Sequence, residues 1–383
     1  MSPIALFIRV ILAIALGGSA AATSAAYGLP PQAGKASKSP ASAPAKPASA
    51  PAKPSAEDAE AMKKGLVKFG DLWVTKEDLP FLKEGKVKVD GEWLTKDEKS
   101  KLDAGWKRQD LEWISPEDQP KMAEGLFKVG DKWLSAAEAD SAHSSASNPW
   151  KIPGKHTILI STLGRDEIVR LLAFSENAAA LTQKILGKQL PSRITVRVFA
   201  TTDEANEFGQ QFAADHSSIW PGYVAERDPD RLAVCSYDKD FAHLYVAHAA
   251  AHKTVDVLVP EADKLADWFL EGLVTYVERF SSTAYKEWAI QQLVRRGGIS
   301  KLDDHLKKMV LSVEDIEGSQ TRLYEAGITF AYFIETPEKA DEEAFKKAIA
   351  SLSKPQKDRM EPISKLLHGE LEKRVRKYSR IDK

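Results

Sequence analysis

His248-Ala-Ala-Ala-His252 is the stretch that decides how the C-terminal half of this chain folds. It lies in a segment, roughly 240–257, whose apolar periodicity predicts a helix. Two histidines four residues apart project from the same face of a helix, where both rings can bind one metal ion. The stretch therefore predicts a helix that carries part of a metal site.

The segments around this helix indicate the fold class. Apolar alternation predicts strands, and longer apolar periodicity predicts helices. Before the histidine helix, the predicted order is strand, helix, strand, helix and edge hairpin, at 157–161, 166–186, 194–199, 202–213 and 222–236. Almost everything after Phe241 is predicted to be helical. The domain 150–383 is therefore expected to be α+β, with a small sheet and helices first and a mostly helical half after it.

A second motif, Trp268-Phe-Leu-Glu271-Gly-Leu-Val-Thr-Tyr276, follows the histidine helix. Together with the order of elements, the two motifs resemble the gluzincin branch of zinc metallopeptidases in its peptidase-MA-like bacterial form. The resemblance covers roughly 150–340 and implies that Glu271 is a third metal ligand beside His248 and His252. Two imidazoles and one carboxylate, with one position left open, are the ligand count of a catalytic zinc site.

The resemblance implies two further roles, and each has an alternative. The edge hairpin would align a peptide by strand addition. Tyr324 would stabilise the oxyanion in an active member of the family, and ordinary helix packing is the alternative for this residue. Asp256, one turn after His252, would orient that imidazole or would simply be a solvated acid.

The chain departs from the family at the general base. A zinc peptidase of this pattern has Glu directly after the first histidine, where it activates the metal-bound water. Ala249 occupies that position. General acid–base help contributes about 10²–10⁴-fold in rate, so its loss removes most of the expected hydrolysis. Glu226 on the predicted hairpin is a candidate for a displaced base. Retention and loss of zinc both remain open.

A 20-residue Gly/Trp repeat occupies 58–140 in four copies. The recurring residues are Gly65, Gly85, Gly105 and Gly125, and Trp73, Trp93, Trp113 and Trp133. A hydroxyl residue two positions after each Trp, with an acid three positions later, predicts a capping box at a helix start. The next Gly lies where a helix should end. Each copy is therefore expected to be a β-hairpin followed by a short helix, stacked on its neighbours so that the Trp rings pack in a core or, alternatively, form a ligand surface. The copies loosely resemble Gly/Trp repeats of secreted bacterial proteins.

The remaining segments indicate export. Arg9, the apolar run 10–16 and small residues up to 26 predict a signal peptide, 1–26, or a membrane anchor if it is not cleaved. The Pro/Ala/Lys-rich segment 27–57 is expected to be a tether, and 141–149 a second linker. A net charge of −1 gives no general field for nucleic acid. The single cysteine, Cys235, is expected to be buried.

These features lead to one main hypothesis and two alternatives. The main hypothesis is an exported pseudoenzyme, periplasmic, envelope-associated or extracellular, that binds a peptide or a cell-envelope component without cleaving it, with or without zinc. The first alternative is an active zinc peptidase with a displaced base. The second is a structural envelope protein in which the repeats matter most.

Overall fold

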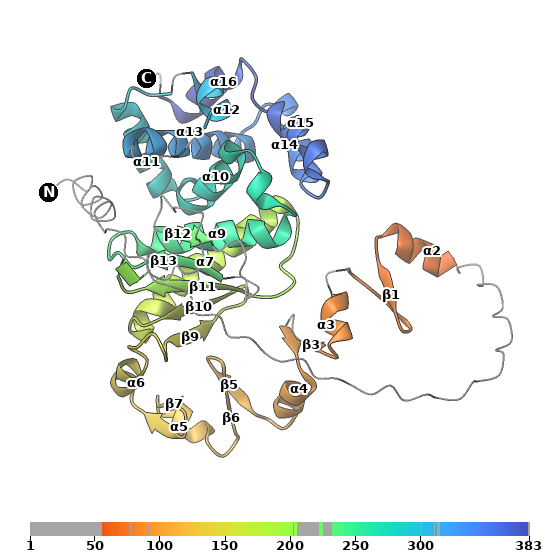
Figure 1. Cartoon of the computed structure of the whole chain (residues 1–383), viewed down its shortest axis with the longest axis vertical. Helices are drawn as coiled ribbons and strands as arrows, with labels where there is room; N and C mark the ends of the chain where they lie inside the picture. The colour runs from red at the N-terminus through yellow and green to blue at the C-terminus, as the bar shows by residue number, and fades with distance from the viewer. Residues whose placement is uncertain are drawn as a thin grey trace, which may run out of the picture. The chain divides into compact units, whose positions relative to one another are not determined.

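The computed structural model describes residues 56–381, apart from 77, 90–91, 202, 205–221, 225–231, 300, 310 and 312–314. The expected signal peptide and nearly all of the expected tether therefore lie outside the described residues. The chain divides into two compact units, 1–84 and 85–383, and each is treated by itself. Figure 1 labels their helices and strands.

The first unit contains one repeat. Its elements are α2 (Ala56–Lys63), β1 (Val67–Phe69), β2 (Leu72–Val74) and α3 (Leu79–Lys83). The two strands pair antiparallel, with Lys68 opposite Trp73. The indole N–H of Trp73 donates to Asp58 on α2 at 3.0 Å, which joins the preceding helix to the hairpin.

Repeats 2 (85–104), 3 (105–124) and 4 (125–142) belong to the second unit, and each is a hairpin with a short helix. Their elements are β3 (Val87–Val89), β4 (Glu92–Leu94), α4 (Lys96–Asp103), β5 (Lys107–Gln109), β6 (Glu112–Ile114), α5 (Gln119–Ala123), β7 (Phe127–Val129), β8 (Lys132–Leu134) and α6 (Ala136–Ala142). Gly105 and Gly125, directly after α4 and α5, have φ near +81°, a conformation that glycine adopts without strain. The expected unit of hairpin, helix and terminating glycine is thus present.

The expected capping box forms in only two of the four copies. In repeat 2, Thr95 accepts from the backbone N–H of Glu98, and the Glu98 carboxylate accepts from that of Thr95 at 2.8 Å. Repeat 4 has the equivalent pair. In repeat 1 the hydroxyl of Thr75 accepts from the backbone N–H of Asp78 at 3.0 Å, so the hydroxyl half of the predicted box is present. In repeat 3 no such bond caps the helix, and in both repeats a proline two residues after the acid (Pro80 and Pro120) lies in the first helical turn. Proline favours this position, so the helix begins later and the acid precedes it.

The Trp rings of the repeats are half-buried and do not form the expected core. In the first three hairpins a cation on the paired strand covers the ring: Lys68 on Trp73 at 5.7 Å, Lys88 on Trp93 at 5.2 Å and Arg108 on Trp113 at 4.6 Å. The residue after the Trp is the buried one, as in Leu94 and Ile114, because neighbouring side chains of a strand point to opposite faces.

A five-stranded sheet begins the C-terminal domain, in the order β12-β13-β11-β10-β9. Its strands are β9 (Trp150–Pro153), β10 (Thr157–Ser161), β11 (Ile194–Phe199), β12 (Gly222–Val224) and β13 (Leu232–Ser236). The three central strands are parallel, and β9 and β12 are antiparallel edges. The predicted edge hairpin corresponds to β12 and β13, although its turn and Glu226 lie outside the described residues. Cys235 on β13 is fully buried, as expected.

Two long helices pack on this sheet and on each other: α7 (Arg165–Leu186) and α9 (Ala242–Leu258). The predicted α+β class is confirmed, because helices make up nearly all of the chain after α9. They are η2 (Ala262–Lys264), α10 (Asp267–Thr275), the π-helix η3 (Tyr276–Phe280), α11 (Thr283–Arg295), α12 (Leu302–Lys307), α13 (Ile316–Glu335), α14 (Lys339–Ser351), α15 (Gln356–Ser364) and α16 (Leu371–Ser379). No helix in the described ranges has both the length and the apolar content needed to cross a bilayer.

Close packing of α10 on α13 fixes the element that carries Glu271. A Cβ added to Gly272 would lie 2.6 Å from the ring of Phe330, and one added to Gly327 would lie 2.7 Å from the ring of Phe280. Two glycines therefore let the helices approach within a distance that a larger residue would prevent.

Candidate metal site

The two histidines of α9 lie side by side on one face of the helix, as their spacing predicts. The centroids of the His248 and His252 rings are 4.7 Å apart, with 62° between the ring planes. The three alanines between them are fully buried, and the helix packs against α7 and the sheet. The buried alanines therefore anchor the helix in the core, which holds both imidazoles at fixed positions.

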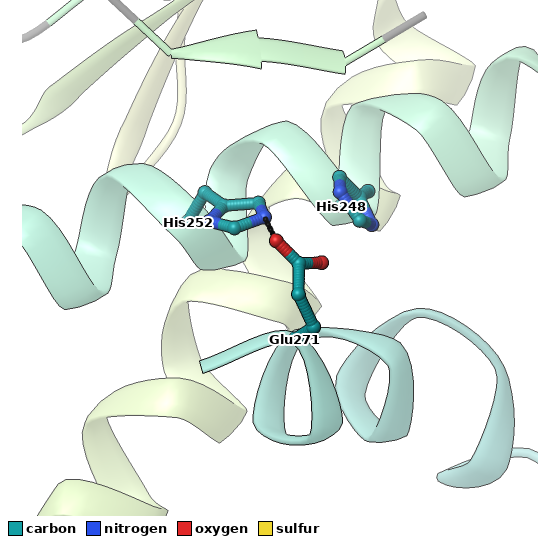
Figure 2. A group of neighbouring side chains, drawn as sticks. All are labelled: His248, His252 and Glu271. Carbon is teal, nitrogen blue, oxygen red and sulfur yellow. Dashed lines mark ion pairs between the residues drawn. The ribbon is translucent and has the colours of Figure 1, made fainter. Parts of the chain in front are cut away.

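Glu271 reaches these rings from α10. Its Oε1 atom lies 3.3 Å from Nε2 of His252, as Figure 2 shows. One ligand atom from each of His248, His252 and Glu271 lies within 4.8 Å of the others, and this group could hold a metal ion. Two ligands of a tetrahedral zinc ion with bonds of about 2.0–2.1 Å lie about 3.3 Å apart. The His252–Glu271 separation already matches that value.

Burial and the charges of the neighbouring side chains shift the pKa values of His252 and Glu271 in opposite directions. Burial by itself would lower the pKa of His252, but the carboxylate of Glu271 raises the pKa above the ordinary value of histidine. Burial by itself would raise the pKa of Glu271, but His252 and His248 lower it. The imidazolium and carboxylate thus form a buried ion pair in the metal-free protein. A metal ion would replace the His252 proton, because a histidine must be neutral to bind one.

The surroundings of the second carboxylate oxygen of Glu271 indicate whether the group could hold a metal ion. The second carboxylate oxygen of Glu271, Oε2, is buried and has no hydrogen-bond partner among the described residues. An unsatisfied buried acceptor of this kind costs about 1–3 kcal/mol, more when it is charged. A cation beside His252 would remove this cost. The donor set, the spacing and the unsatisfied oxygen all fit a bound metal ion.

Glu278 is a residue of this site that the sequence analysis did not identify. It lies on η3, and its Oε2 accepts the N–H of His248 Nδ1 at 2.9 Å. Because Nδ1 carries the proton, Nε2 of His248 keeps a free lone pair. This is the tautomer that can bind a metal ion through Nε2. The signal was present: Glu278 follows Glu271 by seven residues, about two helical turns, and so faces the same side.

Glu278 is itself held by Arg279. The guanidinium lies 2.7 Å from Oε1 of Glu278, and both side chains are almost fully buried. Burial alone would raise the pKa of Glu278, but Arg279 and His248 lower it, so the carboxylate stays ionised. Arg279 also lies over the rings of Trp288 and Tyr324, at 5.6 and 5.7 Å. A chain of contacts thus supports His248 from behind.

Tyr324, the expected oxyanion stabiliser, is buried in this supporting cluster on α13. Its ring packs edge-on against Trp288 at 6.0 Å and lies beneath the guanidinium of Arg296 at 5.8 Å. Burial raises the pKa of its hydroxyl. These contacts resemble the helix-packing alternative, and they give no direct link to the three ligands.

Ala249 is fully buried beside His248, where the family has its general base. Three other carboxylates influence the ligands. Glu278 is committed to His248 and Arg279. Asp256 helps to raise the pKa of His252 through its charge. Asp267 lies one turn before Glu271 on α10, and desolvation together with the charge of Glu271 raises its pKa. A methyl group thus stands where a proton acceptor would be required.

No family model matches the chain, and no curated protein is similar to it in sequence. The assignment of this site therefore depends on the geometry of the ligands and their surroundings.

Proposed function

We propose that the C-terminal domain is a zinc-binding, gluzincin-like domain that does not hydrolyse peptides, and that the protein acts by binding. Two observations together carry this proposal. The three expected ligands lie close together, and the position where a zinc peptidase has its general base is apolar. Nε2 of His252 and Oε1 of Glu271 lie 3.3 Å apart, whereas Ala249 offers no acceptor. Zinc, when bound by His248, His252 and Glu271, would supply a Lewis-acidic centre with an open position for a ligand.

The residues of the chain divide this task. His248 and His252 present ring nitrogens from a rigid helix, and Glu271 neutralises part of the positive charge. Glu278 holds His248 in one tautomer and cannot act as a base, because both of its oxygens are engaged. Without a proton acceptor, a bound peptide or carboxylate would remain intact at this site.

The partner in this proposal is a peptide or a cell-envelope component, met after export to the periplasm, the envelope or the extracellular space. The edge strand β12 supports the peptide, because an antiparallel edge can pair with an extended chain. If the signal is not cleaved, the N-terminus would anchor the protein to the membrane. An active peptidase with a displaced base and a structural envelope protein remain the competing functions.

Zinc titration of the full-length chain tests the metal site. We expect each chain to bind one zinc ion. Calorimetry measures the binding, and metal analysis after dialysis measures the stoichiometry. His252→Gln should lower the affinity by at least 100-fold, because it removes one of the three ligands. His243→Gln is the matched control, since His243 lies on the same helix but bonds to Tyr285. Absence of zinc from the natural chain would contradict the proposal and favour the structural alternative.

A peptide library, assayed with and without a chelator, tests the absence of hydrolysis. We expect no cleavage by the natural chain. Chelator-sensitive cleavage would support the active-peptidase alternative and exclude a purely binding role. Ala249→Glu is the companion variant: cleavage that appears only in this variant would show that the base alone is missing.

A further inference from the structure

Repeat 3 differs from all three other repeats at two consecutive positions, and from repeats 1 and 4 at the next position as well. The four copies can be compared with each other position by position, because they share one 20-residue period. The first position is Arg108 in repeat 3 and Lys elsewhere, at 68, 88 and 128. The second is Gln109, where the others have Phe or Val, at 69, 89 and 129. The third is Asp110, which is Gly in repeats 1 and 4 and Asp in repeat 2.

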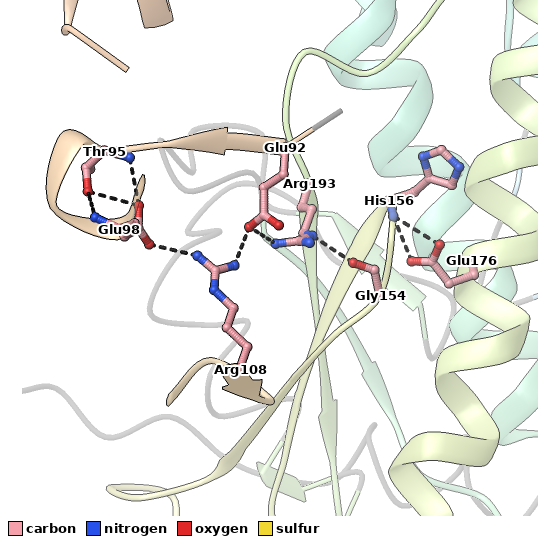
Figure 3. A network of polar contacts seen from close by, with 8 residues as sticks. All are labelled: Glu92, Thr95, Glu98, Arg108, Gly154, His156, Glu176 and Arg193. Atoms are coloured by element: carbon pink, nitrogen blue, oxygen red, sulfur yellow. Dashed lines mark hydrogen bonds and ion pairs between the residues drawn. The ribbon is translucent and has the colours of Figure 1, made fainter. Parts of the chain in front are cut away.

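Arg108 joins repeat 3 to repeat 2 and, through it, to the C-terminal domain. Its guanidinium pairs with Glu92 on β4 and with Glu98 on α4, the latter at 2.8 Å. Glu92 also pairs with Arg193 at 2.8 Å, and Arg193 donates to the carbonyl of Gly154 at 2.7 Å. Figure 3 shows this series of contacts from α4 to the loop before β10. The two terminal nitrogens of the planar guanidinium each pair with a different carboxylate, Glu92 and Glu98.

Gln109 joins repeat 3 to repeat 4. Its side-chain amide donates to the carbonyl of Leu126 at 2.7 Å and accepts from the backbone N–H of Lys128 at 3.2 Å. The glutamine side chain therefore pairs with the backbone of the first strand of repeat 4. The phenylalanine or valine of the other copies can make neither bond.

Asp110 joins repeat 3 directly to the start of α7. Its carboxylate accepts from Arg165 Nη2 at 2.8 Å and from Nε at 3.3 Å. The residue has a φ of +55°, a conformation in which asparagine and aspartate are tolerated but glycine is preferred. The same guanidinium lies over Phe127 of repeat 4, at 4.9 Å. Thus the side chain that stands where repeats 1 and 4 have glycine makes a direct contact between repeat 3 and the C-terminal domain.

Repeat 4 completes this attachment at β9. Asp140 on α6 accepts the indole N–H of Trp150 at 2.9 Å and the backbone N–H of Arg165 at 2.8 Å. Phe127 packs edge-on against Trp150, which is almost fully buried. The repeats thereby contact the edge strand β9 and the first residue of α7, the helix that packs along the histidine helix α9.

We propose that the triplet Arg108-Gln109-Asp110 makes repeat 3 a joint that docks repeats 2–4 on the C-terminal domain, so that 85–383 unfold as one cooperative unit. The repeats then pack against the edge strand β9 and against the start of α7, and we expect them to stabilise both. The docking surface on the C-terminal domain consists of Arg165, Arg193 and Trp150. The segment 141–149 lies between two docked parts and does not act as a free tether.

Replacing the triplet by the residues of repeat 4 tests this proposal in the full-length chain. The variant R108K/Q109V/D110G keeps a sequence that already forms a hairpin at 127–134, so the fold of repeat 3 should survive. We expect the single calorimetric transition of 85–383 to split into two, and cleavage by a broad-specificity protease within 141–149 to become faster. Both readouts should be the same with and without a chelator, which separates this test from that of zinc binding.

Two other variants make the test specific. E112K, which also takes the repeat 4 residue, changes an exposed side chain on β6 and should behave as the natural chain does. R165Q removes the partner of Asp110 from the other side and should reproduce the effect of the triplet. A single transition at the natural temperature, together with unchanged proteolysis in both the triplet variant and R165Q, would overturn the proposal.

Discussion

Glu278→Gln should weaken zinc binding about 10–100-fold, the usual effect of removing a partner that orients a metal ligand. The carboxylate accepts from His248 Nδ1 at 2.9 Å and is held at 2.7 Å by Arg279. Glutamine keeps the size of the side chain and an acceptor oxygen. It removes the negative charge that makes the His248 ring a better electron donor. A 10–100-fold loss corresponds to about 1.4–2.7 kcal/mol of binding free energy.

The same substitution should also destabilise the metal-free protein. Arg279 is almost fully buried, and removing one member of a buried ion pair costs about 3–5 kcal/mol. The rings of Trp288 and Tyr324 over the guanidinium offset part of this cost, so the lower end is expected. At about 2–4 °C per kcal/mol for a protein of this size, the melting temperature should fall by about 6–12 °C.

Competition with a chromophoric zinc chelator measures the affinity, and calorimetry of the metal-free protein measures the stability. Glu325→Gln is a matched control, because Glu325 is also buried and also bonds to a histidine Nδ1, that of His305, at 2.9 Å. The control should lose stability without losing zinc affinity. An unchanged dissociation constant for Glu278→Gln, or an equal loss in the control, would refute the positioning role.

Three further predictions concern the helical half. Burial alone would raise the pKa of Asp341, but Tyr332 and Arg374 lower it, so its contribution to stability is complete above about pH 4 and is lost as the pH falls through the lowered folded pKa. The melting temperature of the natural chain should therefore fall more steeply below pH 4 than that of Asp341→Asn. Gly272→Ala should destabilise by about 1–3 kcal/mol in chemical denaturation, because its Cβ would meet the Phe330 ring at 2.6 Å. Arg359→Met should cost about 1–3 kcal/mol in the same assay, because it removes a buried, charged donor that bonds to the carbonyls of residues 260 and 261.

The sequence predicted the parts of this structure that depend on short-range periodicity. The spacing of His248 and His252 places both on one helix face, and the alternation of 194–199 places Ile194, Val196 and Val198 in the core. The terminating glycines of the repeats were predictable because few other residues adopt a positive φ. The capping pattern alone did not predict where the helices of repeats 1 and 3 begin, because Pro80 and Pro120 place the first helical turn after the acid.

Contacts between distant segments were not predictable in this way. Glu92 and Arg193 are 101 residues apart, and Asp110 and Arg165 are 55 apart. Each of these side chains looks like an ordinary solvated charge in the sequence, since nothing local specifies its partner. The comparison of the four copies did contain a signal, because a polar Gln109 in place of an apolar strand residue suggests a specific contact. It could not identify the contacting segment.

The ligand positions are polar, whereas the position of the general base is apolar. This contrast indicates whether the protein retains zinc binding. A buried ion pair such as His252–Glu271 often contributes less to stability than apolar residues of the same volume. Among the described residues Oε2 of Glu271 has no hydrogen-bond partner, and this oxygen and a second buried pair at Glu278–Arg279 add to the cost of the site without a metal ion. A domain that needed only its fold would be more stable with apolar side chains at these positions. Position 249 already has such a side chain, whereas the three ligand positions and their supporting carboxylate remain polar. This contrast supports a role in which the metal ion is needed and the general base is not.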